Sequence, residues 1–164
     1  MPDSHGYRKI PVSSIGIAGG SERRQGTMKQ RVLFICNRNA GRSQIAEGLM
    51  RALCGDRFEA YSAGMNPSSA INLSTVRVME EAGIDLAHHR PKSFQEFVDM
   101  HFDYLVFMCE NNQPCAQFPR TQHVMYMEFS DPARFVGSDT DVLEGFRALR
   151  ESIRAWLGEA FGCP

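Results

Sequence analysis

The sequence lacks long apolar runs, an excess of charge of one sign and an apolar leader. No stretch of the 164 residues approaches the roughly 18 consecutive apolar residues of a membrane-spanning helix. The N-terminus also lacks the basic start and apolar stretch of a secretory signal. Lys and Arg total 18 against 19 Asp and Glu, so the charge gives no support to a nucleic-acid surface. We therefore expect a cytoplasmic protein with neither a nucleic acid nor a membrane as partner.

The spacing of the cysteines matches no common metal site. The chain has five cysteines, without the even pairing of a disulfide framework or the spacing of a zinc site. The five histidines show no ligand spacing, and His88 and His89 are neighbours in a predicted loop. These patterns favour reduced thiols and indicate no metal and no cofactor. We interpret Cys54, at the end of a predicted helix, as a core residue, while Cys163 in the tail has no evident role.

The chain divides at about residue 30. Residues 1–29 hold several Gly, Pro and Ser without apolar periodicity, which predicts a disordered N-terminal extension. Residues 30–164 are enough for one core but too few for two ordinary domains. We therefore expect a single folded domain over residues 30–164, and we expect it to be a monomer.

Within this domain, runs typical of strands alternate with runs typical of helices. The predicted strands span 31–36, 57–62, 104–108 and 123–126, and the predicted helices span 42–54, 72–83, about 93–100 and 140–161. Two helices are expected to bury apolar stripes, namely Leu73, Val76, Met79 and Ala82, and Val142, Phe146, Leu149, Ile153, Trp156 and Ala160. The alternation predicts a three-layer α/β fold: a four-stranded parallel sheet of order 2-1-3-4 with helices on both faces.

The loop between the first strand and the first helix carries the strongest chemical signal. It reads Cys36-Asn37-Arg38-Asn39-Ala40-Gly41-Arg42-Ser43. A loop that leads into a helix N-terminus can wrap its N–H groups around a tetrahedral oxyanion, and the Arg42 guanidinium can bind two of the anion's oxygens. The same positive field lowers the pKa of Cys36 and makes it a nucleophilic thiolate. The loop therefore predicts chemistry on phosphate or on an anion of the same shape.

Four further side chains are expected to serve this loop. Ser43 can donate its hydroxyl to the Cys36 thiolate or cap the helix. Asn39 tolerates a left-handed backbone and can tie the loop together through its side chain. Cys109 and Asp131 follow the third and fourth strands, whose carboxyl ends meet the first at one edge of a parallel sheet. We therefore expect Cys109 and Asp131 to lie near Cys36.

These residues resemble the low-molecular-weight protein tyrosine phosphatase superfamily. The resemblance rests on Val32-Leu33-Phe34-Ile35-Cys36-x-x-Asn39-x-x-Arg42-Ser43-x-Ile45-Ala46-Glu47, Tyr61-Ser62-Ala63-Gly64, Gly83-Ile84-Asp85 and Asp131-Pro132, and covers roughly residues 30–160. It implies that Cys36 attacks phosphorus, while Asp131 protonates the leaving group and later activates water.

One branch of the superfamily, the thioredoxin-coupled arsenate reductases, is similar in further details. Ser43-Gln44-Ile45-Ala46-Glu47-Gly48 and Asp131-Pro132-Ala133 resemble runs of that branch, and Cys109 and Cys115 follow the third strand, where it keeps two redox cysteines. The resemblance implies a relay: Cys36 attacks arsenate, Cys109 attacks Cys36 and releases arsenite, and Cys115 then attacks Cys109. Thioredoxin is the implied electron donor.

The relay requires movement, because disulfide bonding needs Cα atoms within roughly 7 Å. We expect the loops that carry Cys36 and Cys109 to start further apart, so that residues 109–118 must be mobile. Some family members bind potassium near the catalytic loop. Lys92 falls near one of the positions concerned and can supply the positive charge instead, so we expect no metal there.

Three functions remain open from the sequence. An arsenate reductase is the first, and a phosphatase of tyrosine phosphate or of small phosphomonoesters is the second, since the loop alone would support it. The third is a redox-responsive protein that only holds an oxyanion, although the presence of Cys36, Arg42 and Asp131 together argues against it.

Overall fold

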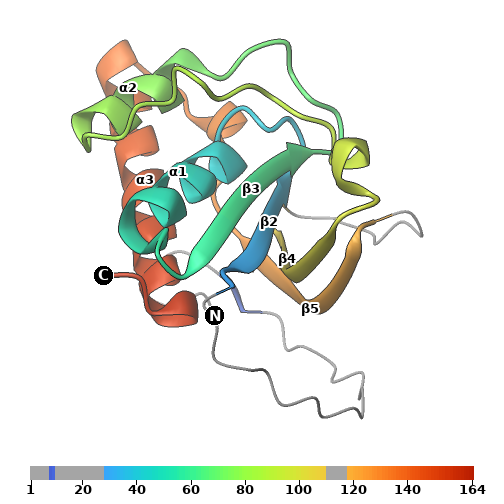
Figure 1. The fold of residues 1–164 in the computed structure, drawn as a ribbon. Coiled ribbons are helices and arrows are strands. Elements are labelled where there is room, and N and C mark those ends of the chain that lie inside the picture. The colour runs from blue at the N-terminus through green and yellow to red at the C-terminus, as the bar shows by residue number, and fades with distance from the viewer. Residues whose placement is uncertain (1–7, 10–27, 110–117) are drawn as a thin grey trace.

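The computed structural model describes residues 8–9, 28–109 and 118–164, and their centre is one sheet of strand order β1-β5-β4-β2-β3 (Figure 1). The strands are Arg8–Lys9 (β1), Gln30–Cys36 (β2), Phe58–Gly64 (β3), His101–Phe107 (β4) and Arg120–Glu128 (β5). The strands β2 to β5 run parallel, and their order is the expected 2-1-3-4. The predicted fold class is therefore confirmed.

The short strand β1 is an addition that the sequence did not indicate. Arg8 lies opposite Glu128 and Lys9 opposite Met127, so β1 pairs antiparallel with the edge strand β5. Arg8 and Lys9 fall within residues 1–29, for which we expected a disordered extension. Residues 1–7 and 10–27 of that extension lie outside the described part of the chain, so the expectation stays a prediction for them.

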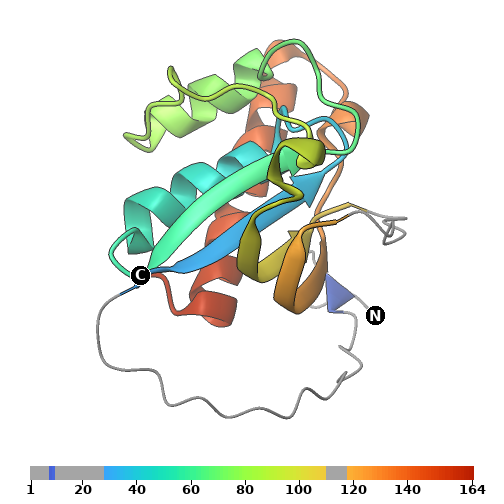
Figure 2. The ribbon, with the colours of Figure 1, turned by 45° about the vertical axis from the view of Figure 1, so that its right-hand side comes forward.

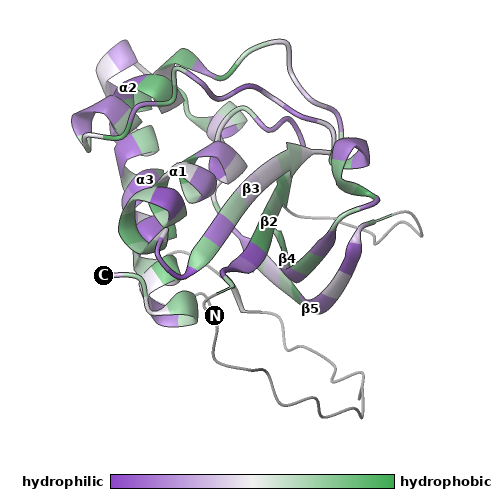
Figure 3. Ribbon diagram, in the orientation of Figure 1, coloured by the Kyte–Doolittle hydropathy of each residue, from purple (hydrophilic) through white to green (hydrophobic). Residues whose placement is uncertain are grey.

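The central strand β2 separates two apolar clusters. Val32 and Phe34 belong to one cluster, while Leu33 and Ile35 belong to the other, because successive side chains of a strand point to opposite faces. All four are fully buried, which explains the continuous apolar run (Figure 3). The sheet therefore has apolar cover on both sides.

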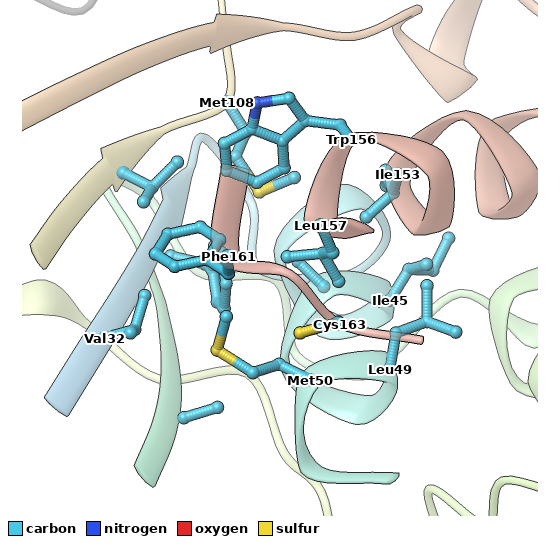
Figure 4. Packing of buried hydrophobic residues seen from close by; sticks show 14 of the residues in the cluster. Val32, Ile45, Leu49, Met50, Met108, Ile153, Trp156, Leu157, Phe161 and Cys163 are labelled. Carbon is cyan, nitrogen blue, oxygen red and sulfur yellow. The ribbon is translucent and has the colours of Figure 1, made fainter. Parts of the chain in front are cut away.

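Three helices lie on one face of this sheet (Figure 2), namely α1 (Arg42–Cys54), α2 (Leu73–Glu81) and α3 (Asp139–Phe161). Trp156 of α3 fills the middle of that layer, with its ring centroid 6.5 Å from Phe34 and 5.8 Å from Phe129. Figure 4 shows it beside Leu157 and Phe161 of the same helix. The other face is covered by the 3-10 helix η1 (Phe94–Phe97), whose two Phe side chains pack on Leu33 and Ile35.

The predicted apolar stripes were partly wrong at their ends. Leu73 is 83% exposed, because it is the first residue of α2 and that helix buries Thr75, Val78 and Met79 instead. Ala82 lies past the end of α2 and is exposed. In α3 the stripe continues through Leu157 and Phe161 rather than the exposed Ala160.

The helix α3 has well-defined ends. Ser138 and Asp141 form a capping box at its N-terminus, and Gly162 at its C-terminus adopts the left-handed backbone, with φ of 65°, that glycine accommodates without strain. No helix within residues 28–109 and 118–164 is long and apolar enough to cross a membrane.

Candidate active site

Cys36 is the last residue of β2, and the loop that follows it leads directly into the N-terminus of α1. The structure thus places Cys36 at the carboxyl edge of the sheet, as predicted. We call residues 36–43 the oxyanion loop. The N-cap of α1, Gly41, provides no side-chain cap, so the first N–H groups of the helix are left for an anion.

The segment 65–72 holds the oxyanion loop from outside. Four of its N–H groups donate to loop carbonyls: Met65 to Cys36 at 3.0 Å, Asn66 to Asn37 at 2.8 Å, Ser68 to Arg38 at 2.9 Å and Asn72 to Ala40 at 3.0 Å. Since a peptide N–H points away from its neighbouring C=O, this pattern turns loop N–H groups toward the thiol. The Asn39 N–H accordingly donates to Cys36 Sγ at 3.2 Å.

Gly64, the last residue of β3, allows the oxyanion loop to lie against the sheet. A Cβ atom at this position would sit 2.8 Å from the Asn37 carbonyl oxygen and 3.0 Å from the Asn39 nitrogen. Both neighbours are backbone atoms of the loop, which cannot swing aside as a side chain can. Glycine is therefore required at this point by the close approach of two backbones.

Asn39 ties the loop together through its side chain, with the left-handed backbone that the sequence predicted. Its backbone is left-handed, with φ of 50°, and its side chain is fully buried. The Lys92 N–H donates to Asn39 Oδ1 at 2.8 Å, which fixes the orientation of the amide. Asn39 Nδ2 then donates to the hydroxyl oxygens of Ser43 at 2.8 Å and Ser62 at 2.9 Å.

Cys36 is held as a thiolate by its neighbours. Because the Ser43 hydroxyl oxygen already accepts from Asn39, its own proton points to Cys36 Sγ, 2.8 Å away. The pKa of Cys36 is lowered to about 6, first by the hydrogen bond from the Cys109 thiol, against its burial, and then by Ser43 and the charge of Arg42. Cys36 is therefore largely ionised at neutral pH.

Cys109 already contacts the catalytic thiol. Its sulfur accepts from the Asn37 N–H at 3.1 Å, and its hydrogen bond to Cys36, together with burial, raises its own pKa. The two side chains meet because β4 lies directly beside β2 and ends at the same edge, while the expected separation of the two Cα atoms stays a prediction. Cys115, predicted as the resolving thiol, and residues 110–117 lie outside the described residues.

Asp131 faces the same site from the end of β5. Its Oδ1 lies 3.6 Å from Arg42 Nη2 and also accepts from the Ala133 N–H at 3.0 Å, so Asp131 caps the 3-10 helix η2 (Pro132–Arg134). A cleft of about 470 Å³ opens between the oxyanion loop and this turn. The residues that line it include the predicted Cys36, Asn37, Arg38, Ala40, Gly41, Arg42 and Asp131.

A buried carboxylate lies beneath the loop. Glu47 is 2% exposed; it accepts a short hydrogen bond from Ser62, and its other oxygen lies 2.7 Å from Arg51 Nη2. The Lys92 ammonium is 3.6 Å from Glu47 and donates to the Arg90 carbonyl at 3.1 Å. Lys92 thus brings the positive charge that we expected near this position.

No set of three His, Cys, Asp or Glu able to hold a metal gathers within the described ranges 8–9, 28–109 and 118–164. The metal-free site nevertheless stays a prediction, because residues 110–117 fall outside those ranges.

The sequence reasoning missed a second support of the loop, formed by Gln44 and His89. Gln44 Nε2 donates to the Asn39 and Arg90 carbonyls at 3.1 and 3.0 Å, so its Oε1 accepts from His89 Nδ1 at 2.9 Å. Burial lowers the pKa of His89, which favours the neutral ring. The sequence shows only a glutamine next to Ser43, and its partner His89 is distant along the chain.

The remaining two cysteines correct a further expectation. Cys54 and Cys163 form a disulfide with a Cα–Cα distance of 5.5 Å, whereas the sequence favoured reduced thiols throughout. Their separation of 109 residues gave no pairing signal, because only the packing of α3 against α1 brings them together. Cys36 and Cys109 are thiols and take part in no disulfide.

Comparisons with known proteins place the chain in a family. The sequence model described as low molecular weight phosphotyrosine protein phosphatase matches residues 31–158. An arsenate reductase of Halalkalibacterium halodurans is 30% identical over 126 residues, which make up 76% of this chain and 90% of that protein.

Solved structures of an arsenate reductase and of a tyrosine phosphatase share the fold. A thioredoxin-dependent arsenate reductase from Corynebacterium glutamicum has a TM-score of 0.56 at 28% identity, and the match covers 80% of this chain and 61% of that one. The tyrosine phosphatase Wzb from Escherichia coli K30, solved with sulphate, has a TM-score of 0.59 at 26% identity, with 80% of this chain and 99% of that one covered.

The ionisation of Cys36 should be measurable by its reactivity. We expect the rate of iodoacetamide alkylation at Cys36, followed by peptide mass spectrometry, to rise with pH through a midpoint near 6, because only the thiolate reacts. Cys109→Ala removes the largest cause of the low pKa and should move the midpoint to higher pH. Cys109→Ser keeps a donor and should move it less. An unshifted midpoint in Cys109→Ala would contradict the assigned cause.

The hydrogen bonds of Asn39 predict that its replacement lowers both the stability of the fold and the reactivity of Cys36. Asn39→Ala leaves Ser43, Ser62 and the Lys92 N–H without their buried partner, which should lower the free energy of unfolding by about 2–3 kcal/mol. It should also raise the Cys36 pKa, since Ser43 is no longer oriented. Asn66→Ala is the matched control, because Asn66 is exposed and its amide reaches only Asn37. Equal stability of the two variants in urea titrations would refute the claim that the Asn39 side chain stabilises the loop.

Proposed function

The chain belongs to the low molecular weight phosphotyrosine protein phosphatase family, and within that family we propose that it is an arsenate reductase. The observation that carries the proposal is the position of the Cys109 thiol, which accepts from the Asn37 N–H at 3.1 Å and lies close enough to Cys36 to lower its pKa. Hydrolysis of a phosphomonoester needs one thiolate, an oxyanion site and an acid. A second thiol in contact with the nucleophile is needed for reduction.

The first step forms a covalent adduct on Cys36. Arsenate binds to the inward N–H groups of the oxyanion loop and to Arg42, which exchanges its contact with Asp131 for the anion. The Cys36 thiolate attacks arsenic, and the arsenic–oxygen bond opposite it breaks. Asp131 lies within reach of that departing oxygen and gives it a proton, so that water leaves.

The second step transfers two electrons. Cys109 attacks the Cys36 sulfur, the sulfur–arsenic bond breaks, and arsenic keeps the bonding pair and departs as arsenite. Arsenic is reduced from the pentavalent to the trivalent state, and two thiols become one disulfide.

The order of the two steps follows from the coupling of the thiols. The pKa of Cys109 is raised first by its hydrogen bond to Cys36, then by burial and by the Cys36 charge. Two of these three causes vanish once Cys36 carries arsenic, because the thiolate no longer exists. Cys109 therefore becomes nucleophilic only after the adduct has formed.

The disulfide must then be reopened. We assign this step to Cys115, which attacks Cys109 and frees Cys36, and to an external dithiol protein of the thioredoxin class. Such a donor is kept reduced in the cytoplasm, which is where we place this protein, and we propose that it acts as a monomer.

Hydrolysis of phosphomonoesters is the second candidate, and the cleft favours it. A volume of about 470 Å³ leaves room beside the oxyanion for an organic group, and Asp131 on its rim can protonate a leaving alcohol. Phe146 is the aromatic side chain among the residues that line the cleft, so a small or polar leaving group fits better than one that needs aromatic walls.

Loss of the nucleophile should remove both activities. Cys36→Ser should turn over neither arsenate, with a thioredoxin system as donor, nor an aryl phosphate, because a serine hydroxyl stays protonated in the same field. Steady-state rates above background on either substrate would place the nucleophile elsewhere.

The two downstream cysteines separate reduction from hydrolysis. Cys109→Ser should stop multiple turnover of arsenate while sparing slow hydrolysis of an aryl phosphate. Cys115→Ser should stop after about one turnover with a Cys36–Cys109 disulfide, which peptide mapping would identify. If both variants reduce arsenate repeatedly at the parent rate, the relay is wrong and hydrolysis becomes the leading function.

A further inference from the structure

A second pair of cysteines lies outside the catalytic machinery. Cys54 is the last residue of α1, Cys163 follows the end of α3, and their sulfur atoms are bonded. Both are buried, Cys54 at 1% and Cys163 at 7% exposure. Figure 4 shows Cys163 at the layer formed by α1 and α3, close to Leu49 and Met50. No step of the proposed relay uses either residue.

Non-covalent contacts place Cys163 opposite Cys54. The left-handed Gly162 reverses the chain, and the N–H groups of Gly162 and Cys163 donate to Gly158 and Leu157 at 3.0 and 3.3 Å. Arg57, just after the end of α1, donates to the Gly162 carbonyl at 2.9 Å. These bonds do not depend on the disulfide, so the reduced chain also keeps the two thiols close together.

This pair cannot exchange directly with the catalytic thiols. Cys36 precedes the N-terminus of α1 and Cys54 forms its C-terminus. The 13 residues of α1 span about 18 Å at 1.5 Å per residue. A sulfur–sulfur contact across that distance would require α1 to unfold.

We propose that Cys54 and Cys163 are a second redox site, which reacts with small-molecule disulfides of the glutathione class and fastens the end of the chain to α1. The Cys163 thiolate, which is the more exposed, attacks the small disulfide and releases one small thiol. Cys54 then attacks the Cys163 sulfur of this mixed disulfide and releases the second. Two protein thiols are oxidised, and one small disulfide is reduced to two thiols.

The site changes stability rather than catalysis. The bond closes a loop across 109 residues, and cross-links that close long loops restrict the unfolded chain most. For a chain of this length, we expect the oxidised form to melt about 5–15 °C higher than the reduced form.

The test isolates this pair in the full chain. Cys36→Ser, Cys109→Ser and Cys115→Ser together leave Cys54 and Cys163 as the two remaining thiols of the five cysteines. After exposure to oxidised glutathione, a thiol titration should find none free, intact mass should show no attached glutathione, and thermal melting should rise. A phosphine reductant should restore two thiols and the lower melting temperature.

Adding Cys163→Ala to this background provides the control. Its melting temperature should match that of the reduced parent and should not respond to oxidised glutathione. Two thiols that stay free, a stable glutathione adduct on Cys163, or an unchanged melting temperature after bond formation would each overturn the proposal. None of these measurements uses arsenate, so their outcome is independent of the proposed reductase activity.

Discussion

The backbone carbonyls and the backbone N–H groups of the oxyanion loop face opposite sides. Its carbonyls are bound from outside by the N–H groups of residues 65–72, and the buried Asn39 amide ties it from beneath to Ser43, Ser62 and Lys92. The N–H groups that remain converge on Cys36. Gly64 permits this arrangement, since any larger residue would push the loop off the sheet edge. An anion therefore enters a site that needs no rearrangement of its backbone.

The charged side chains in and beneath the site are also paired. Arg42 lies 3.6 Å from Asp131, and its charge helps to lower the pKa of Cys36. Beneath them, the buried Glu47 would repel an incoming oxyanion if it were alone, but Arg51 and Lys92 neutralise it. The two thiols are coupled, because the hydrogen bond to Cys36 and the Cys36 charge raise the pKa of Cys109.

Much of this could be predicted from the sequence, because its strongest signals are local. The strand, the loop and the helix N-terminus lie within residues 30–54, and that contiguity predicted the positions of Cys36, Arg42 and Ser43 and the side-chain hydrogen bonds of Asn39. The parallel order of the sheet then predicted that Asp131 and Cys109 lie at the carboxyl edge, where Cys36 also lies.

What could not be predicted depends on distances between segments far apart in sequence. The support of Gln44 by His89 and the Cys54–Cys163 bond each join segments that no periodicity connects. The exposure of Leu73 has a similar origin, because the start of α2 is set by its cap at Asn72 and not by apolar spacing.

We propose that two thiols within the chain reduce the bound oxyanion. The most direct measurement is a single-turnover reaction of fully reduced protein with arsenate, without any external donor, in which arsenite and free thiols are counted together. We expect about one arsenite per chain and the loss of two thiols, both absent when phosphate replaces arsenate. Binding of arsenate with no arsenite and no loss of thiols would contradict it.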